Sequence, residues 1–565
     1  MTSAGDADAL PTEPPQVRTA GAPPVTPGAP DTHVVPAWFG EERTPSGVWR
    51  AAILLVAFAA VAGALPPLHE MDLAQHLATG EWIVRRGAVP FTEPFAWTRA
   101  GEPYFAYSWL AQVIYYVLLR AFGPVALHVL EGLIVGSATA AALWAARQFG
   151  WRPAARLAVG VLHLALLWGV AGTLRPQQVL FIAVPLAWGI AARIRTRGAR
   201  ASRLLALAAV GALAANTHIF FALTAVPIAW FAIEDPRRTR WLGAGAALAV
   251  GWLLTPYALA WPAVFALNFG DNVLLGRPPS ISEFVPGFEY ARERLAVIVV
   301  VLVLLTVPWL TAARARPLPT RVGAALFWSV GLLLFAYAGR LVFAWWTLAL
   351  PIAGYALHVV AGRAAPALAR GFGRLVAAGL AAILLSASVP PISPAFWLFE
   401  GDATNRMLPR AGEDPALWLP TWLLCHTQPG ARGRIFTEFN YGSELTWRLP
   451  GYSPSIDGRT IFPDSDAVEF SFQPYGRRGG HASTWRHADL ALLDRSFWLA
   501  PVLDTVPDWV LLAQGRATSR GTLAALWAKR EWWQRWGTAA QLPALDIRVL
   551  DPRARCAAEG VFPRP

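Results

Sequence analysis

Long apolar stretches alternate with short polar gaps from residue 48 to residue 389. Many of the apolar runs are roughly 17–22 residues long, about the length that an α-helix needs to cross a bilayer. The pattern therefore predicts a polytopic α-helical membrane protein with about eleven transmembrane helices. The predicted helices lie near residues 48–66, 125–146, 154–173, 177–194, 203–216, 218–233, 241–260, 295–312, 322–338, 341–361 and 371–389.

The segment 107–122 contains Gln112 and Arg120 and is short for a full crossing. If it lies at the membrane surface, the arginine-rich gaps all fall on one side, as the positive-inside rule requires. This topology puts the N-terminus in the cytoplasm and the C-terminus outside. The cytoplasmic arginines are then Arg147, Arg152, Arg156, Arg193, Arg195, Arg197, Arg200, Arg203, Arg237, Arg238, Arg240, Arg314, Arg316, Arg321, Arg363, Arg370 and Arg374.

The same topology leaves several polar loops on the external side. Each of them carries ionisable or amide groups next to the membrane, so we expect them to share one cavity. These external loops are 67–124, 173–178, 216–218, 261–294 and 337–340.

The character of the sequence changes near residue 396. Residues 434–439 and 452–458 predict short strands around a helical GSELTWRL, and 508–514 and 546–551 predict later strands around a helix at 521–536. The predicted domains are therefore a disordered cytoplasmic tail (1–46), a transmembrane domain (47–395) and a small extracytoplasmic α/β domain (396–565). Cys425 and Cys556 both lie in the last domain, as a disulfide or as two unpaired thiols.

Composition agrees with a membrane protein and argues against nucleic-acid binding. Only 15% of the 565 residues are charged, against about 25% in a soluble protein, and the mean hydropathy is +0.40. The net charge of +12 comes from arginines in the short loops, where topology explains them. The chain has no P-loop, dinucleotide-binding fingerprint or paired-cysteine zinc pattern.

The stretch HEMDLAQHLATG follows the first apolar run and carries two acids. One interpretation is structural, with Asp72 as a helix N-cap and Gln75 completing a capping box. A capping box leaves Glu70 unexplained. Glu70 and Asp72 can share a divalent cation, Mg²⁺ or Mn²⁺, or one can take a proton from a hydroxyl while the other orients it. His76 lies on the same helix and is a candidate cavity residue.

This stretch, with HLATGEWIVRRGAVPFTEPFAW and YSWLAQVIYYVLLRAFG, resembles the GT-C superfamily of membrane glycosyltransferases, which use polyprenyl-phosphate-linked sugars. The resemblance in architecture covers most of the chain, whereas the motifs that carry it are short and degenerate. It implies an inverting transfer in which Asp72 is the base and Glu70 a helper or metal ligand. Glu93 stands in PFTEPF where the family has an aspartate, which argues against a direct catalytic role for it.

The segment FTEFNYGSELTWRLPGYSPSIDGRT resembles a segment of related bacterial membrane proteins, which implies a location in the bacterial inner membrane. Within it, Asp457 and Arg459 either bind an acceptor glycan or form an internal ion pair, and the ion pair is favoured.

Further candidates lie at the external ends of the predicted spans. Arg175 and Arg340 can bind the donor phosphate, with contact to lipid headgroups as the alternative. Asn216, His218 and Glu283 are candidates for substrate contacts, each with a structural alternative. His128 and Glu131 share one face of an apolar span and either serve the cavity or stabilise each other.

The sequence thus predicts an inverting glycosyltransferase that moves a sugar from a polyprenyl-phosphate donor to an acceptor hydroxyl on the external face. The expected partners are membrane lipids, the lipid-linked donor and a glycan, lipid or protein acceptor, with no nucleic acid. The alternatives are a flippase or transporter for a lipid-linked substrate and a non-catalytic envelope scaffold. A flippase needs the cationic groove but no base.

Overall fold

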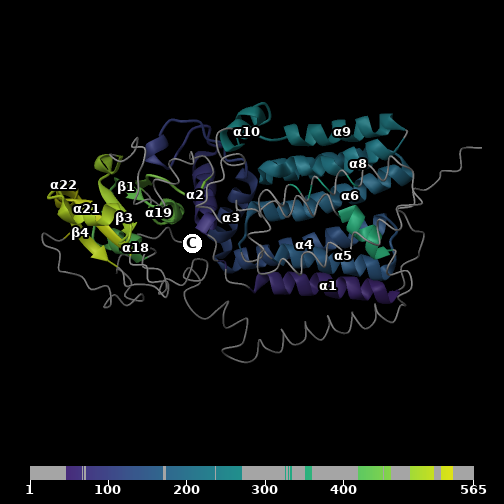
Figure 1. Ribbon diagram of the computed structural model, residues 1–565, viewed down its shortest axis with the longest axis horizontal. Helices are drawn as coiled ribbons and strands as arrows, with labels where there is room; N and C mark the ends of the chain where they lie inside the picture. Colours follow the sequence, from purple (N-terminus) through teal and green to yellow (C-terminus); the bar gives the residue numbers. More distant parts are fainter. Residues whose placement is uncertain are drawn as a thin grey trace, which may run out of the picture. The chain divides into compact units, whose positions relative to one another are not determined.

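The computed structural model describes a series of N-terminal helices and a C-terminal part built around a small sheet (Figure 1). The described residues are 46–65, 68, 71–168, 173–235, 237–269, 325, 329, 331, 333, 350–358, 418–449, 451–459, 484–514 and 524–538.

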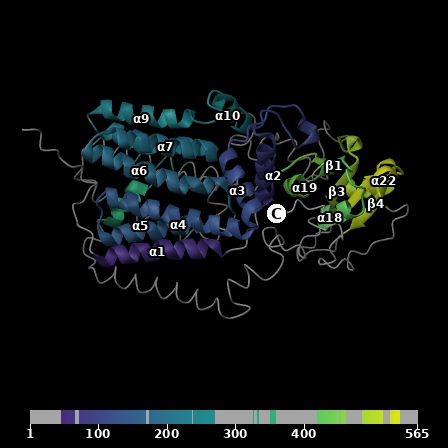
Figure 2. The same cartoon turned by 180° about the vertical axis from the view of Figure 1, so that it is seen from behind.

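The apolar runs of the first half form helices. Helices α1, α4, α6, α7 and α9 run side by side, each in contact with the next (Figure 2). The elements of this half are α1 (Ser46–Ala64), α2 (Met71–Arg86), η1 (Trp97–Arg99), α3 (Trp109–Phe122), α4 (Val125–Gln148), α5 (Pro153–Trp168), η2 (Pro176–Val179), α6 (Leu180–Arg197), α7 (Ala201–Thr217), η3 (Ile219–Ala225), α8 (Val226–Glu234), α9 (Arg238–Leu253) and α10 (Trp261–Phe269).

Within the described residues, three helices are long and apolar enough to cross a membrane, namely Gly47–Ala64, Val125–Gln148 and Pro176–Arg197. Other predicted spans correspond to shorter apolar helices, such as α7. The predicted spans at 295–312 and 371–389 lie outside the described residues, and those at 322–338 and 341–361 lie there in large part. The count of about eleven spans therefore stays a prediction.

Helices α1 and α4 approach each other closely because glycines line the contact. A Cβ atom on Gly132 or Gly136 of α4 would collide with Ala60 of α1, and one on Gly63 would lie 2.8 Å from Val135. Small residues of this kind let helix backbones meet, which is how helices associate in lipid. Backbone proximity therefore fixes the pairing of these two helices.

Helices α2 and α3 form a second close pair. A Cβ atom on Gly80 of α2 would collide with the carbonyl group of Gln112 in α3. Leu73, Leu77 and Tyr115 are buried between the two helices, in a cluster that also contains Leu174. This cluster anchors the start of α2, where Asp72 lies.

The C-terminal part contains a five-stranded sheet in the order β2-β1-β3-β5-β4. Strand β1 pairs in parallel with β2 and β3, whereas β5 pairs antiparallel with β3 and β4. The elements of this part are α18 (Trp418–Cys425), β1 (Gly433–Thr437), α19 (Phe439–Arg448), β2 (Tyr452–Pro454), η9 (Thr484–His487), β3 (Leu490–Asp494), α21 (Leu499–Thr505), β4 (Trp509–Gln514), β5 (Ala524–Lys529) and α22 (Arg530–Trp536).

Both faces of the sheet are covered. Leu445 of α19 and Trp533 of α22 pack on one face with Ile435. On the other face, Ile83 of α2 and Tyr104 from the segment between α2 and α3 pack in a cluster with Phe436 of β1. Residues of the predicted external loop thus form part of the core of the C-terminal sheet.

The structure confirms the predicted strands near 434–439, 452–458 and 508–514 and the helix between the first two. It corrects the helix predicted at 521–536, because residues 524–529 form strand β5 and the helix begins only at Arg530. Five of the six residues of β5 are buried, and a short segment buried on both sides has no periodicity that separates strand from helix. The strand predicted at 546–551 and Cys556 lie outside the described residues.

Candidate functional site

Asp72 lies in the first turn of α2, where the partial positive charge of the helix N-terminus favours a carboxylate. The helix begins at Met71, two residues earlier than the capping-box interpretation requires, because a cap at Asp72 would make Leu73 the first helical residue. The Gln75 amide donates instead to the Thr79 hydroxyl, at 3.2 Å. The Asp72 side chain is 37% exposed and so is open to a reactant.

Arg175 faces Asp72 from the turn before η2. Its Nη2 atom lies 3.5 Å from Oδ2 of Asp72. The preceding residue, Leu174, is fully buried and has a φ of 49°, a left-handed conformation that costs a non-glycine residue free energy. The Gln178 side chain, in η2 directly after this turn, donates to Glu131 of α4, at 2.8 Å. The turn is therefore anchored on both sides of Arg175, with a strained backbone next to it.

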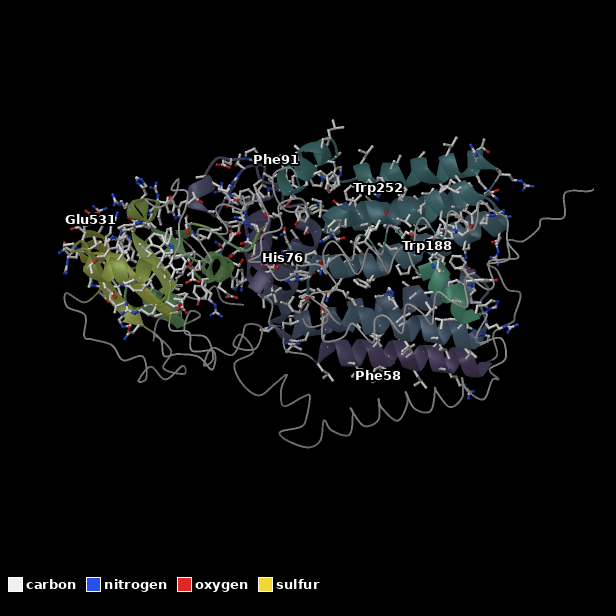
Figure 3. All side chains as sticks on the ribbon, in the orientation of Figure 1. Phe58, His76, Phe91, Trp188, Trp252 and Glu531 are labelled. Atoms are coloured by element: carbon white, nitrogen blue, oxygen red, sulfur yellow. The ribbon has the colours of Figure 1, made fainter. Side chains whose placement is uncertain are left out.

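His76 lies one turn after Asp72 on α2 (Figure 3). Its Nδ1 atom lies 3.2 Å from the amide nitrogen of Gln112, which donates to it, so the imidazole proton is on Nε2. Burial, with a smaller effect of Arg175, lowers the pKa of His76 to about 3. The imidazole is thus a neutral hydrogen-bond donor at physiological pH.

A pH dependence follows from this shift. The unfolded chain binds a proton at His76 below about pH 6.5, whereas the folded protein does so only below about pH 3. The free energy of unfolding therefore decreases as the pH is lowered from about 6.5 to about 3. We expect wild type to lose about 1–2 kcal/mol of unfolding free energy relative to His76→Gln between pH 7 and pH 5. Thermal unfolding of both proteins at the two pH values measures the difference. Parallel loss in wild type and variant would contradict the prediction.

The C-terminal part meets α2 at the turn Asp457–Arg459. Helix α19 packs against α2, and a Cβ atom on Gly458 would lie 2.9 Å from Oδ1 of Asp72. The Gly458 N–H donates to Ser443 of α19, at 3.2 Å. The Asp72 carboxylate therefore lies between Arg175 on one side and the backbone of Gly458 on the other.

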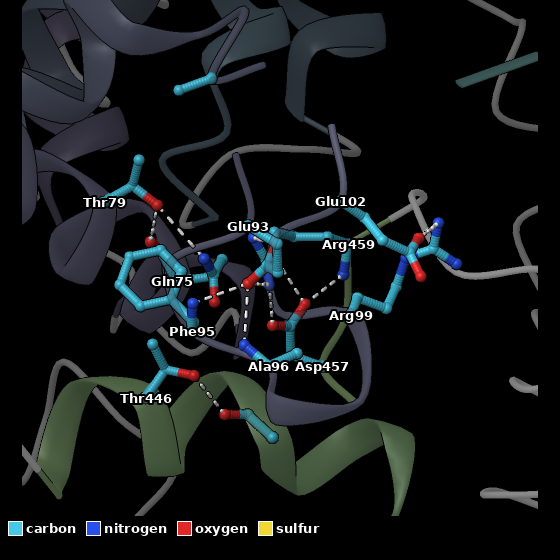
Figure 4. A network of polar contacts seen from close by, with 12 residues as sticks. Gln75, Thr79, Glu93, Phe95, Ala96, Arg99, Glu102, Thr446, Asp457 and Arg459 are labelled. Atoms are coloured by element: carbon cyan, nitrogen blue, oxygen red, sulfur yellow. Dashed lines mark hydrogen bonds and ion pairs between the residues drawn. The ribbon is translucent and has the colours of Figure 1, made fainter. Parts of the chain in front are cut away.

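Arg459 ties this turn to the segment between α2 and α3 (Figure 4). Its Nη1 and Nη2 atoms each donate to one oxygen of Glu93 at 2.7 Å, and its Nε and Nη2 donate to the two oxygens of Asp457 at 2.7 and 2.6 Å. Both carboxylate side chains are 0% exposed, and the guanidinium lies 4.6 Å from the ring centroid of Tyr104. The ion pair of Asp457 and Arg459 is thus internal, and Glu93 is its third member.

The surroundings of this cluster shift the pKa values of Arg459 and Tyr104 upwards. Burial lowers the pKa of Arg459, but Asp457 and Glu93 raise it more, and the net result lies above the ordinary value. Burial raises the pKa of Tyr104 to about 12, and its hydroxyl bonds to Arg459 and Thr79. A polar network therefore runs from Gln75 on α2 through Thr79 and Tyr104 to Arg459.

Some of the other predicted site residues are among those that the structure describes, and the rest are not. Asn216 accepts a hydrogen bond from the Trp109 indole at 2.7 Å and donates to two backbone carbonyls, and His218 accepts one from the Phe220 N–H at 3.2 Å. These contacts join loops and helix ends, which is the structural alternative for both. The Nδ1 atom of His128 lies 3.2 Å from the Ala64 carbonyl. Glu70, Arg340 and Glu283 lie outside the described residues.

Within the described residues, no group of three or more His, Cys, Asp or Glu side chains is placed to hold a metal ion. Glu70, the proposed second ligand beside Asp72, lies outside those residues, so the metal alternative remains an expectation.

No protein-family model matches the chain, and no curated protein matches it. Solved structures do match it. One is the cryo-EM structure of the arabinofuranosyltransferase AftD from Mycobacteria, with a TM-score of 0.51 and 15% identity over 86% of this chain and 40% of that chain. The chain therefore shares its overall fold with that arabinofuranosyltransferase. The chain spans less than half the length of AftD, and the similarity extends to the fold alone.

Two contributors to the site were missed in the sequence. Gly458 touches the proposed base, and Glu93 binds Arg459 although 366 positions separate them. Both PFTEPF and IDGR stand out as motifs, but nothing in one sequence pairs them.

Proposed function

We propose that the chain is an inverting glycosyltransferase of GT-C type that uses a polyprenyl-phosphate-linked sugar. The observation that carries the proposal is the pair of Asp72 and Arg175, 3.5 Å apart, at the start of the helix that follows the first apolar span. An exposed carboxylate next to a guanidinium supplies the base and the phosphate ligand that this reaction needs. The GT-C-like fold supports the same class of enzyme.

In the proposed reaction, Asp72 takes the proton of an acceptor hydroxyl as its oxygen attacks the anomeric carbon of the donor. The bond from that carbon to the phosphate oxygen breaks, and the electron pair leaves with the polyprenyl phosphate. Positive charge develops on the sugar in an oxocarbenium-like transition state, while negative charge grows on the phosphate. Arg175 stabilises the departing phosphate, and attack from the opposite face inverts the anomeric centre.

The remaining features of the proposal concern the substrates and the location. AftD is named an arabinofuranosyltransferase, which makes arabinofuranose the first sugar to test. The acceptor is a hydroxyl of an envelope glycan, lipid or protein, and Arg340 and Glu283 are further candidates for binding substrate. We place the enzyme in the bacterial inner membrane with the C-terminal part outside the cytoplasm, consistent with the positive-inside pattern of its arginines.

A transfer assay tests the proposal. The purified full-length chain, in liposomes, is given a donor panel of polyprenyl-phosphate monosaccharides that begins with arabinofuranose and continues with hexoses. Envelope glycans from a deletion strain, with and without complementation, are compared by mass spectrometry. Loss of one sugar in the deletion strain and transfer of that sugar in vitro are expected. Movement of intact donor across the liposome membrane without cleavage would favour the flippase.

Arg175→Gln tests the phosphate contact. Hydrogen bonds to charged groups contribute about 1.5–3 kcal/mol, so we expect kcat/KM for the donor to fall roughly 10- to 100-fold. Steady-state kinetics at varied donor concentration measure the effect. Arg85→Gln is the matched control, because Arg85 is exposed and pairs with Glu81 on the same helix as Asp72. Equal kcat/KM values for Arg175→Gln and wild type would exclude the proposed contact.

A further inference from the structure

Gly458, in the C-terminal part, lies against the proposed base. A Cβ atom there would lie 2.9 Å from Oδ1 of Asp72 and 3.1 Å from Oγ of Ser443, and real Cβ atoms essentially never approach another atom to within 3.0 Å. Its φ lies outside the left-handed region, so the need for glycine is steric rather than conformational. The peptide backbone thus forms one wall around the carboxylate.

This wall is rigid. On one side of Gly458, Asp457 is fully buried, and on the other Arg459 is held by four hydrogen bonds to Asp457 and Glu93. The Gly458 N–H itself donates to Ser443. Gly442 lets α19 lie directly on the same turn, because a Cβ atom at Gly442 would collide with the Ile456 carbonyl. If a side chain at position 458 and Asp72 compete for space, the end of the flexible Asp72 side chain is therefore the group that moves.

We propose that Gly458 is a positioning residue that fixes the Asp72 carboxylate in its reactive orientation towards Arg175 and the acceptor hydroxyl. The inference rests on the proposed function in so far as Asp72 is the base. It also assigns a role to the C-terminal part, which completes the reaction centre in addition to any role in binding acceptor. Arg459 and Glu93 act through Gly458 by holding the turn in place.

The size of the expected effect follows from the geometry. A reacting group displaced by about 1 Å can lower the rate on the order of 100-fold. Displacement of the base does not alter how tightly the enzyme binds the donor. The loss is therefore expected in kcat, with KM for the donor nearly unchanged. An effect on folding alone would lower the amount of active protein and leave the environment of Asp72 unaltered in the folded fraction.

Gly458→Ala tests the proposal in the full-length protein. We expect kcat on the donor panel to fall on the order of 100-fold. Independently of activity, peptide mass spectrometry measures the rate at which a water-soluble carbodiimide labels Asp72, and this rate is expected to change. Gly245→Ala is the matched control, because a Cβ atom at Gly245 in α9 meets nothing within 4 Å. Ser443→Ala, which removes the hydrogen bond to the turn, replaces Gly458→Ala if that variant does not fold.

The two readouts separate the inference from the function on which it rests. A changed labelling rate with no transfer by wild type would support the contact and reject the proposed enzyme. Transfer by wild type, with both kcat and Asp72 labelling unchanged in Gly458→Ala, would overturn the positioning role.

Discussion

Asp72→Asn is expected to abolish transfer while leaving the protein folded. Asparagine keeps the size of the side chain and its capacity to accept hydrogen bonds at a helix N-terminus, but it cannot take a proton. General base catalysis typically contributes about 10²- to 10⁴-fold to a rate, and the variant is expected to lose at least that. The measurement is kcat on the donor panel, with thermal unfolding and membrane yield recorded in parallel.

Glu81→Gln is the matched control for this prediction. Glu81 lies on the same helix and pairs with the exposed Arg85, a surface contact that contributes little. Its loss is expected to leave kcat nearly unchanged, because the Glu81–Arg85 pair takes no part in the proposed reaction and an exposed ion pair adds only about 0–1 kcal/mol to stability. Retention of more than a tenth of wild-type kcat by Asp72→Asn would show that another group takes the proton.

The largest stability effect is expected for Arg459→Met. The variant leaves Glu93 and Asp457 as two carboxylates with no exposure and no cation, and breaking a buried pair in this way costs about 3–5 kcal/mol. Thermal unfolding of the purified protein and its yield in membranes measure the loss. The Arg459→Met substitution keeps a long apolar side chain in the space, so the effect reports on charge rather than on a cavity.

Two further variants test whether the loss comes from the two uncompensated buried carboxylates. Arg495→Gln removes a half-exposed ion pair with Asp504 in the same part of the chain and is expected to cost about 1 kcal/mol or less. Adding Glu93→Gln and Asp457→Asn to Arg459→Met removes the uncompensated charges and is expected to recover part of the stability. A stability of Arg459→Met equal to that of Arg495→Gln would mean that the cluster is solvated.

The membrane helices could be read from the sequence because their pattern is local. A helix in lipid must satisfy its own backbone, so a long apolar run has few alternatives, and α1 and α4 begin and end within about two residues of their predictions. The strands of the C-terminal part gave a weaker signal. Residues 490–494 and 524–529 are short and almost wholly buried, and one of them was predicted as helix while the other was not recognised.

The candidate site was predictable only in its local parts. The position of Asp72 after an apolar run and of Arg175 at a span end drew attention to each, and topology placed them on the same side of the membrane. The sequence gives no distance between them, however, and it gives no reason to join PFTEPF to IDGR. That connection depends on how a distant segment packs on α2 and on the sheet, and one sequence holds no record of such long-range contacts.

The glycine contact between α1 and α4 has a consequence beyond the bilayer. Helix α1 ends at Ala64, and only six residues separate it from α2, which carries Asp72 in its first turn. With so short a connection, sliding or rotation of α1 against α4 would be passed on to the carboxylate. A side chain at Gly132 or Gly136 would push α1 away from α4 close to the end of α1 that leads into α2, so these two glycines bear on the position of Asp72 without contacting it.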